Sequence, residues 1–120
     1  MNPTVDETEF GHITVNGNVY DHDIVIRLSG QVKKRKKKLS KQQHGTSHTV
    51  SLAEAEHMYD EGAERIVLGT GQHGVLELSN AAREFFQNHG CTVMAAPTPD
   101  AVKIWNHAEG KTIAMFHVTC

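Results

Sequence analysis

Residues 65–74 read Arg-Ile-Val-Leu-Gly-Thr-Gly-Gln-His-Gly, an apolar strand that runs directly into three glycines. The stretch from Gly69 to Gly74 matches the dinucleotide-binding fingerprint letter for letter. That fingerprint also needs a helix that opens at its third glycine and an acidic residue after the next strand. The next helix start here is Ser79, and no acid lies between the strand at 92–96 and Asp100. The stretch therefore predicts a sharp turn at the end of a buried strand, and no nucleotide cofactor.

The second half of the chain alternates helix and strand. Ser51, Ser79 and Thr98 each precede an apolar periodic stretch, which predicts three helix starts. Strands are predicted at 65–68, 92–96 and 112–118. This alternation is typical of a largely parallel sheet with helices packed on it, and ligands of such sheets bind beyond the carboxyl ends of the strands.

The first half of the chain has a different pattern. Asn16-Gly17 separates two β-prone stretches and suits a type I′ turn, so residues 10–20 predict a β-hairpin. Residues 23–27 predict a further strand, and the polar stretch 40–50 predicts a loop. The expected fold is an α/β domain with a central mixed sheet, an N-terminal β-hairpin and three helices.

Length and composition indicate one cytoplasmic domain. The chain has 120 residues, which suit a single domain spanning residues 1–120. Its two cysteines, Cys91 and Cys120, form no disulfide framework and suit a reducing compartment. No apolar run is long enough to cross a membrane, and the N-terminus lacks the features of a signal or transit peptide.

The net charge of −2 hides a basic segment. Residues 33–41 hold seven of the twelve basic side chains and no acid, so the remainder carries a net charge of −9. We expect this segment to be solvated, either as a lysine-rich sheet edge or as a binding surface. The candidates for binding phosphate or an acidic partner are Lys33, Lys34, Arg35, Lys36, Lys37 and Lys38. No aromatic residue lies between Tyr20 and Tyr59, so nucleic-acid binding would be weak and without sequence choice.

Further candidate ligand-binding residues are spread along the chain. They are Asp23, Ser47, His48, Gly69, Thr70, Gly71, His73 and His117. The peptide N–H groups of the glycine turn could bind a small anion. His44 and His48 have a metal-ligand spacing only if helical, and Gly45 lies between them, so no metal site is predicted.

Four stretches together resemble a known family. They are Tyr20-Asp-His-Asp-Ile-Val-Ile26, His44-Gly-Thr-Ser-His48, Gly69-Thr-Gly71 and His117-Val-Thr-Cys120. Over nearly its whole length the chain resembles the archaeal branch of the Mth938-like domain family, whose relatives include a mitochondrial complex I assembly factor and an adipogenesis-associated protein. The resemblance implies a compact three-layer α/β domain with a central mixed sheet. It implies no reaction and no catalytic residue.

Two functional hypotheses follow. The first is a non-enzymatic, cytoplasmic binding or accessory protein, monomeric or homodimeric, whose partner is a protein or a small anionic ligand. The second is an enzyme whose site gathers the Gly69–Gly71 turn, the His44–His48 loop, and Asp23 or His117. The enzyme hypothesis requires these groups to line one concave pocket within hydrogen-bond reach of each other.

Overall fold

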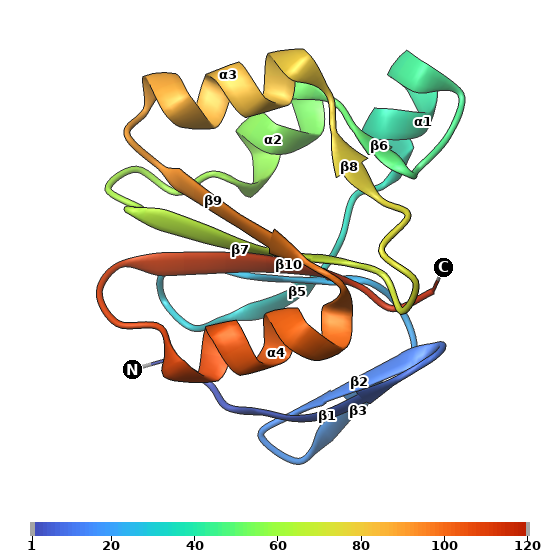
Figure 1. The fold of residues 1–120 in the computed structure, drawn as a ribbon, viewed down its shortest axis with the longest axis vertical. Helices are drawn as coiled ribbons and strands as arrows, with labels where there is room; N and C mark the ends of the chain where they lie inside the picture. Colours follow the sequence, from blue (N-terminus) through green and yellow to red (C-terminus); the bar gives the residue numbers. More distant parts are fainter. Residues whose placement is uncertain (1, 120) are drawn as a thin grey trace.

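A mixed five-stranded sheet forms the centre of the protein in the computed structural model, which describes residues 2–119 (Figure 1). Its strands, in spatial order, are β5 (Val32–Lys34), β4 (Ile24–Ile26), β10 (Thr112–His117), β7 (Arg65–Thr70) and β9 (Thr92–Ala96). Strands β10, β7 and β9 run parallel, whereas β4 and β5 are antiparallel to their neighbours. The predicted α/β fold with a mixed sheet is confirmed.

The N-terminal hairpin is part of a separate three-stranded antiparallel sheet. It consists of β1 (Val5–Glu9), β2 (His12–Val15) and β3 (Asn18–Tyr20). Asn16 and Gly17 both have positive φ, as a type I′ turn requires. The predicted hairpin lacked the first strand, because β1 is mostly polar and exposed, and only Val5 is fully buried in it.

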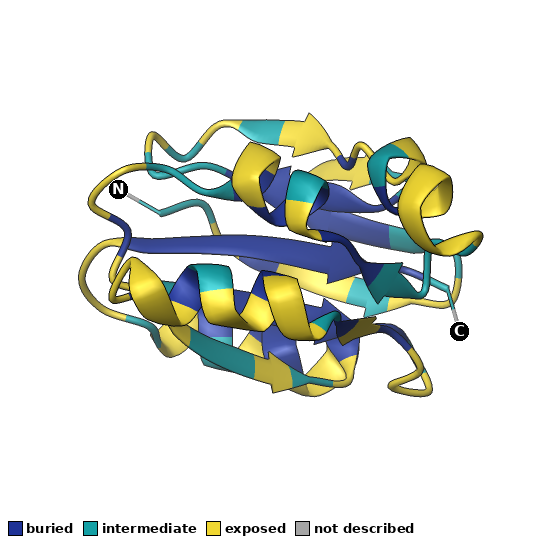
Figure 2. Cartoon of the chain, turned by 90° about the horizontal axis from the view of Figure 1, so that it is seen from above, coloured by how far each residue is buried: buried dark blue, intermediate teal, exposed yellow. Residues whose placement is uncertain are grey.

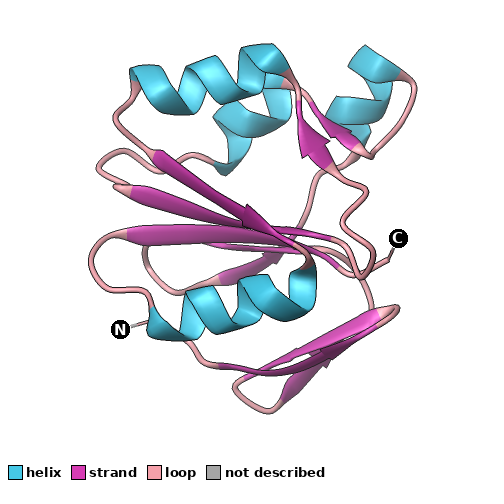
Figure 3. Cartoon of the chain, in the orientation of Figure 1, coloured by secondary structure: helices cyan, strands magenta, loops and turns pink. Residues whose placement is uncertain are grey.

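Residues 2–119 contain four helices, one more than predicted (Figure 3). They are α1 (Lys38–His44), α2 (Leu52–Met58), α3 (Asn80–Asn88) and α4 (Thr98–His107). The short strands β6 (Thr49–Val50) and β8 (Glu77–Leu78) pair in parallel. The prediction of a loop over 40–50 was wrong for the helical part, because α1 fully buries a polar residue, Ser40, and so shows no apolar periodicity.

Two of the three predicted helix caps are confirmed. The Ser51 and Ser79 hydroxyls accept hydrogen bonds from the N–H groups of Glu54 and Ala82. The third was wrong, because Pro97 occupies the N-cap of α4 and Thr98 lies inside the helix. The Thr98 hydroxyl instead donates to the carbonyl oxygen of His117, at 2.6 Å.

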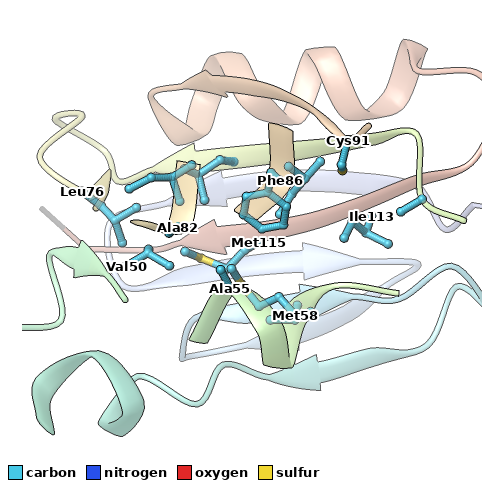
Figure 4. Packing of buried hydrophobic residues seen from close by; sticks show 14 residues of the cluster. Val50, Ala55, Met58, Leu76, Ala82, Phe86, Cys91, Ile113 and Met115 are labelled. Atoms are coloured by element: carbon cyan, nitrogen blue, oxygen red, sulfur yellow. The ribbon is translucent and has the colours of Figure 1, made fainter. Parts of the chain in front are cut away.

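The central sheet has an apolar core on each face. One core lies between the sheet and helices α2 and α3, and contains Met58, Leu68, Phe86 and Met115 (Figure 4). The other lies between the sheet, α4 and the N-terminal sheet, and contains Trp105 and other residues of these elements. Figure 2 shows the inner strands as buried and the outward sides of the helices as exposed. Because successive side chains of a strand face opposite sides, β7 and β10 contribute to both cores.

Candidate functional site

The fold brings several candidate residues to one end of the central sheet. Strands β7 and β10 are parallel and in register, so Thr70 lies beside His117 at their carboxyl ends. Strand β4 is antiparallel to β10, with Ile24 opposite Phe116. Asp23, which immediately precedes β4, therefore lies beside His117 although 94 positions separate the two residues.

The carboxylate of Asp23 is fully hydrogen-bonded. Its Oδ2 atom accepts from His117 Nδ1 at 2.7 Å and from Arg35 Nη1 at 2.9 Å, and its Oδ1 atom accepts from the Val118 N–H at 2.8 Å. Burial opposes ionisation, but the hydrogen bond from His117, that from Val118, the charge of His117 and the hydrogen bond from Arg35 outweigh it. Together they lower the pKa of Asp23 to about 2. Because the ionised carboxylate only accepts, His117 carries a proton on Nδ1.

Arg35 is buried, and the prediction that the whole basic segment is solvated was wrong for this residue. Its side chain is fully enclosed, and Nε and Nη2 donate to the two oxygens of Glu54 at 2.6 and 3.0 Å. This two-pronged geometry is specific to a guanidinium and explains why arginine stands in a run of lysines. Burial opposes the charge, but Glu54 and Asp23 together raise the pKa of Arg35.

Ser40 completes this buried group. Its hydroxyl donates to Glu54 and accepts from the Ser51 N–H. We call Asp23, Arg35, Ser40, Glu54 and His117 the ion cluster. It joins the start of β4, the end of β5, helices α1 and α2 and the end of β10. Ser40 and Glu54 were not identified from the sequence. The signal that could have pointed to Glu54 is Arg35, because a single arginine among lysines indicates a carboxylate partner for its guanidinium group.

The His44–His48 segment lies beside the ion cluster but does not act as one unit. Helix α1 ends at His44, and Gly45 follows with a φ of 72°, so the two histidines do not share a helix. The rings of His48 and His117 meet edge to face, with centroids 5.6 Å apart. Ser47 accepts a hydrogen bond from Arg35 Nη2 through its carbonyl oxygen, at 2.7 Å.

The glycine turn after β7 is shaped by close packing. A Cβ atom at Gly69 would lie 2.8 Å from Phe116 Cδ1 and 2.9 Å from Thr98 Oγ1, so a larger residue would force the side chains of Phe116 and Thr98 to move. The Gly71 N–H donates to Thr98 Oγ1, and the Gly71 carbonyl accepts from the N–H groups of Thr98 and Gly74. The peptide groups of Gly71 are therefore already paired. His73 is exposed on the same turn.

The ion cluster has some features of a catalytic site but is closed. A carboxylate that holds Nδ1 of a histidine is the arrangement that prepares the opposite nitrogen as a base. His117 Nε2, however, lies 3.4 Å from Thr119 Oγ1, and the residue is only 3% exposed. Cys120, which follows this histidine by three positions in the sequence, lies outside the described residues. The hydrogen bonds and ion pairs of the ion cluster connect elements that are distant in the sequence, so these contacts stabilise the fold.

A second charged region is open to solvent. A groove of about 650 Å³ runs between α2 and the β4–β5 edge of the sheet. Its basic residues are Arg27, Lys33, Lys34, Lys36 and His57, and its other lining residues are Val25, Leu28, Ser29, Gln31, Asp60 and Glu61. We call this region the basic groove. Sequence reasoning found its lysines but missed Arg27 and His57, which precede and follow the basic segment in the chain.

One wall of the basic groove is held together by hydrogen bonds from Arg27 and Leu28. Arg27 Nη2 donates to Asp60 at 2.7 Å, and Arg27 Nη1 donates to the His57 carbonyl at 2.8 Å. The Leu28 N–H donates to the other Asp60 oxygen at 2.9 Å. The pKa of His57 is lowered, first by partial burial and then by the charges of Lys36, Arg27 and Lys33, against an opposing effect of Glu54.

Two further kinds of site find no support in the residues that the structure describes. Over residues 2–119, no group of three or more His, Cys, Asp or Glu side chains is placed to hold a metal ion. Over the same range, no helix is long and apolar enough to cross a membrane.

These features define a small α/β domain with a mixed sheet, a buried ion cluster at one sheet end and a basic groove at one sheet edge. Residues 5–117 match the model of a family described as "Protein of unknown function (DUF498/DUF598)". The chain belongs to this family, as the resemblance to Mth938-like domains predicted. No curated protein matches it.

Solved structures agree with this assignment. A conserved hypothetical protein, PH1505 from Pyrococcus horikoshii, is 34% identical, with a TM-score of 0.89 over 98% of this chain and 99% of that one. The protein MT938 is 32% identical, with a TM-score of 0.85 over 99% and 100% of the two chains. A Bordetella pertussis protein described as a Mth938-like domain is 24% identical with a TM-score of 0.62 over 97% and 85%, which shows the fold alone.

Proposed function

We propose that this protein is a non-enzymatic binding protein that recognises an acidic segment of a partner protein through the basic groove. The observation that carries the proposal is that neighbouring basic residues differ in burial and in ion pairing. Arg35 is buried and paired with two carboxylates, whereas Lys33, Lys34 and Lys36 are exposed and line an open groove. The fold thus fixes the backbone of the basic segment through Arg35 and leaves its lysines available to a ligand.

The lining of the basic groove favours an acidic peptide over a nucleic acid. None of the described lining residues is Phe, Tyr or Trp, so bases would find no stacking surface. Asp60 and Glu61 lie on the α2 side of the groove, so a ligand whose negative charges are confined to a few side chains fits it better than a continuous phosphate backbone does. Leu28, which is partly exposed, provides apolar surface for a side chain of a peptide.

The basic groove also has more support than the other candidate sites. The Gly71 N–H that a small anion would need is paired with Thr98. The histidine that an enzyme would need is buried, and its Nε2 atom contacts Thr119 Oγ1. By contrast, the three lysines of the basic groove are exposed, and among the described residues none of them forms a salt bridge.

The proposal is tested by fluorescence anisotropy with a labelled Glu-Glu-Leu-Glu-Glu peptide, at low and at high salt. We expect binding at low salt that weakens as salt screens the charges. Lys33→Gln/Lys36→Gln should weaken binding about fivefold, because each exposed ion pair contributes roughly 0.5 kcal/mol. The matched control is Lys103→Gln/Lys111→Gln, which removes the same charge from exposed positions outside the basic groove.

Three results would contradict the proposal. The first is no binding to the peptide at low salt. The second is an equal loss of affinity in both double variants, which would mean that only the net charge of the molecule acts. The third is tighter binding of a labelled single-stranded oligonucleotide of similar charge, which would favour nucleic acid as the ligand.

A further inference from the structure

The two edges of the central sheet are protected very differently. Strand β5 forms one edge and carries Lys33 and Lys34, which is a common way to prevent pairing with another strand. Strand β9 forms the other edge, with the sequence Thr-Val-Met-Ala-Ala and no charge. In Figure 1, β9 lies on the near side of the sheet and β5 on the far side. Over the described residues, β9 pairs with β7 alone.

The hydrogen bonds of β9 show which groups face outward. The Thr92 N–H donates to the Glu64 carbonyl, on the β7 side. Along a strand the N–H and C=O groups alternate between its two sides, so Met94 and Ala96 also bond towards β7. The main-chain groups of Val93 and Ala95 therefore point away from the sheet.

The row of outward-facing main-chain groups on β9 is short, and it ends at Pro97 on one side and at Cys91 on the other. The next outward position after Ala95 is Pro97, which has no N–H, and its carbonyl accepts from Asp100 and Ala101 in α4. The previous outward position is Cys91, whose N–H donates to the Phe86 carbonyl. Between Cys91 and Pro97, the free edge consists of two N–H and two C=O groups, on Val93 and Ala95.

We infer that β9 pairs antiparallel with β9 of a second copy of this chain, about a two-fold axis at Met94. In this register Val93 lies opposite Ala95 of the second copy and exchanges two hydrogen bonds with it, and Ala95 does the same with Val93. All four outward groups of each edge are then satisfied. A two-fold dimer is the commonest symmetric assembly of a single chain.

The surroundings of β9 suit this pairing. A hollow of about 440 Å³ lies beside Val93, between β9 and the α3 residues Arg83 and Gln87. A second hollow, of about 400 Å³, lies beside Met94 on the α4 face, next to Ile104 and Arg65. The pairing would bring side chains of the second copy against both hollows. No like charges face each other across the strands, because β9 has none.

A second copy explains the edge better than an arbitrary strand does. The row of free groups is bounded by Cys91 and Pro97, and a second β9 has the same length and the same bounds. The resulting sheet would have ten strands and end on both sides at β5, whose lysines oppose further growth. The two basic grooves would then lie at opposite ends of the dimer.

Sedimentation velocity across a concentration series up to about 1 mM tests the inference, because this range reaches weak complexes. We expect the wild-type chain to pass from monomer to dimer. Ala95→Pro removes an N–H that faces outward and leaves the bonds to β7 intact. Because it removes two of the four intermolecular hydrogen bonds, it should raise the dissociation constant about tenfold or more.

A second variant tests the position of the axis. Met94→Lys would place two ammonium groups directly opposite each other, and we expect it to remain monomeric over the whole series. The control is Val19→Lys, which adds the same charge at an exposed position of β3. It should dimerise like the wild type. Circular dichroism spectra that match the wild type show that each variant is folded.

Two outcomes would overturn the inference. A wild-type chain that stays monomeric at the highest concentration excludes pairing at this edge. A wild-type dimer that persists unchanged in Met94→Lys and Ala95→Pro shows that the chain dimerises through another surface. The peptide-binding assay is independent of both outcomes, because the basic groove lies at the opposite edge of the sheet.

Discussion

The ion cluster and the basic groove both contain cations from one run of six residues, Lys33–Lys38, but use them in opposite ways. In the ion cluster, Arg35 is enclosed and each of its nitrogens has an acceptor. In the basic groove, Lys33 and Lys36 are exposed beside an open volume. A run of like charges can therefore contain one structural residue among solvent-exposed ones. Burial and partners distinguish the two, whereas charge does not.

Replacing Arg35 should have the largest effect on stability. Arg35→Met leaves the carboxylates of Asp23 and Glu54 buried without their cation, and should lower the free energy of unfolding by about 3–5 kcal/mol. Chemical denaturation measures this change. The control is Lys34→Met, one position away and exposed, which should change stability by less than about 0.5 kcal/mol. Equal losses in the two variants would remove the distinction between the ion cluster and the basic groove.

Acid should weaken the ion cluster next most strongly. The pKa of Asp23 falls from 3.8 to about 2 on folding, so ionised Asp23 stabilises the native state above its ordinary pKa. This contribution, about 2 kcal/mol, is lost as the pH falls through 3.8 towards 2.

Urea denaturation between about pH 5 and pH 2 measures this dependence. The comparison variant is Asp23→Asn, which has no carboxylate to titrate. It should be less stable at the upper end of the range and lose less stability on acidification. Parallel stability curves for the two proteins would contradict the assigned role of Asp23.

Replacing Thr98 should have a smaller effect. Thr98→Val keeps the side-chain shape but removes the hydroxyl that joins the Gly71 N–H to the His117 carbonyl. Both groups are then left unpaired in the interior, which should cost about 1–2 kcal/mol in thermal or chemical denaturation. An unchanged stability would show that water or another group satisfies them. The Gly71 N–H would then be more accessible than its bond to Thr98 indicates.

Removing the lysines of the basic groove should have the smallest effect on stability. Lys33→Gln/Lys36→Gln should change the free energy of unfolding by less than about 0.5 kcal/mol, because both side chains are exposed. Its effect should fall on peptide binding alone. A loss of stability comparable with that of Arg35→Met would mean that these lysines also hold the fold together.

Much of the fold could be predicted because its signals are local. The Asn16-Gly17 turn and the Ser51 and Ser79 caps act within a few residues, and the structure confirms them. Helix α1 could not be predicted, since it is held by Ser40 contacting residues 11 and 14 positions away. Thr98 was mistaken for a cap because its real partners, Gly71 and His117, are distant in the sequence.

The candidate sites were predicted in part for the same reason. The residue types of the ion cluster were visible as Asp23, Arg35 and His117, but their contacts depend on the antiparallel pairing of β4 with β10. The lysines of the basic groove were visible as a charge run, whereas Arg27 and His57 join them only through the packing of α2 on the sheet. No local sequence pattern indicates which distant residues become neighbours in the folded protein.

The most direct test of the distinction between the two regions is an NMR titration of the ¹⁵N-labelled protein with the Glu-Glu-Leu-Glu-Glu peptide at low salt. We expect amide signals to shift at Lys33, Lys34, Lys36 and His57, and these shifts to disappear at high salt. Signals of Gly69–Gly74 and His117 should stay in place. Shifts confined to Gly69–Gly74 or His117, with none along the basic groove, would show that the peptide does not bind at the basic groove.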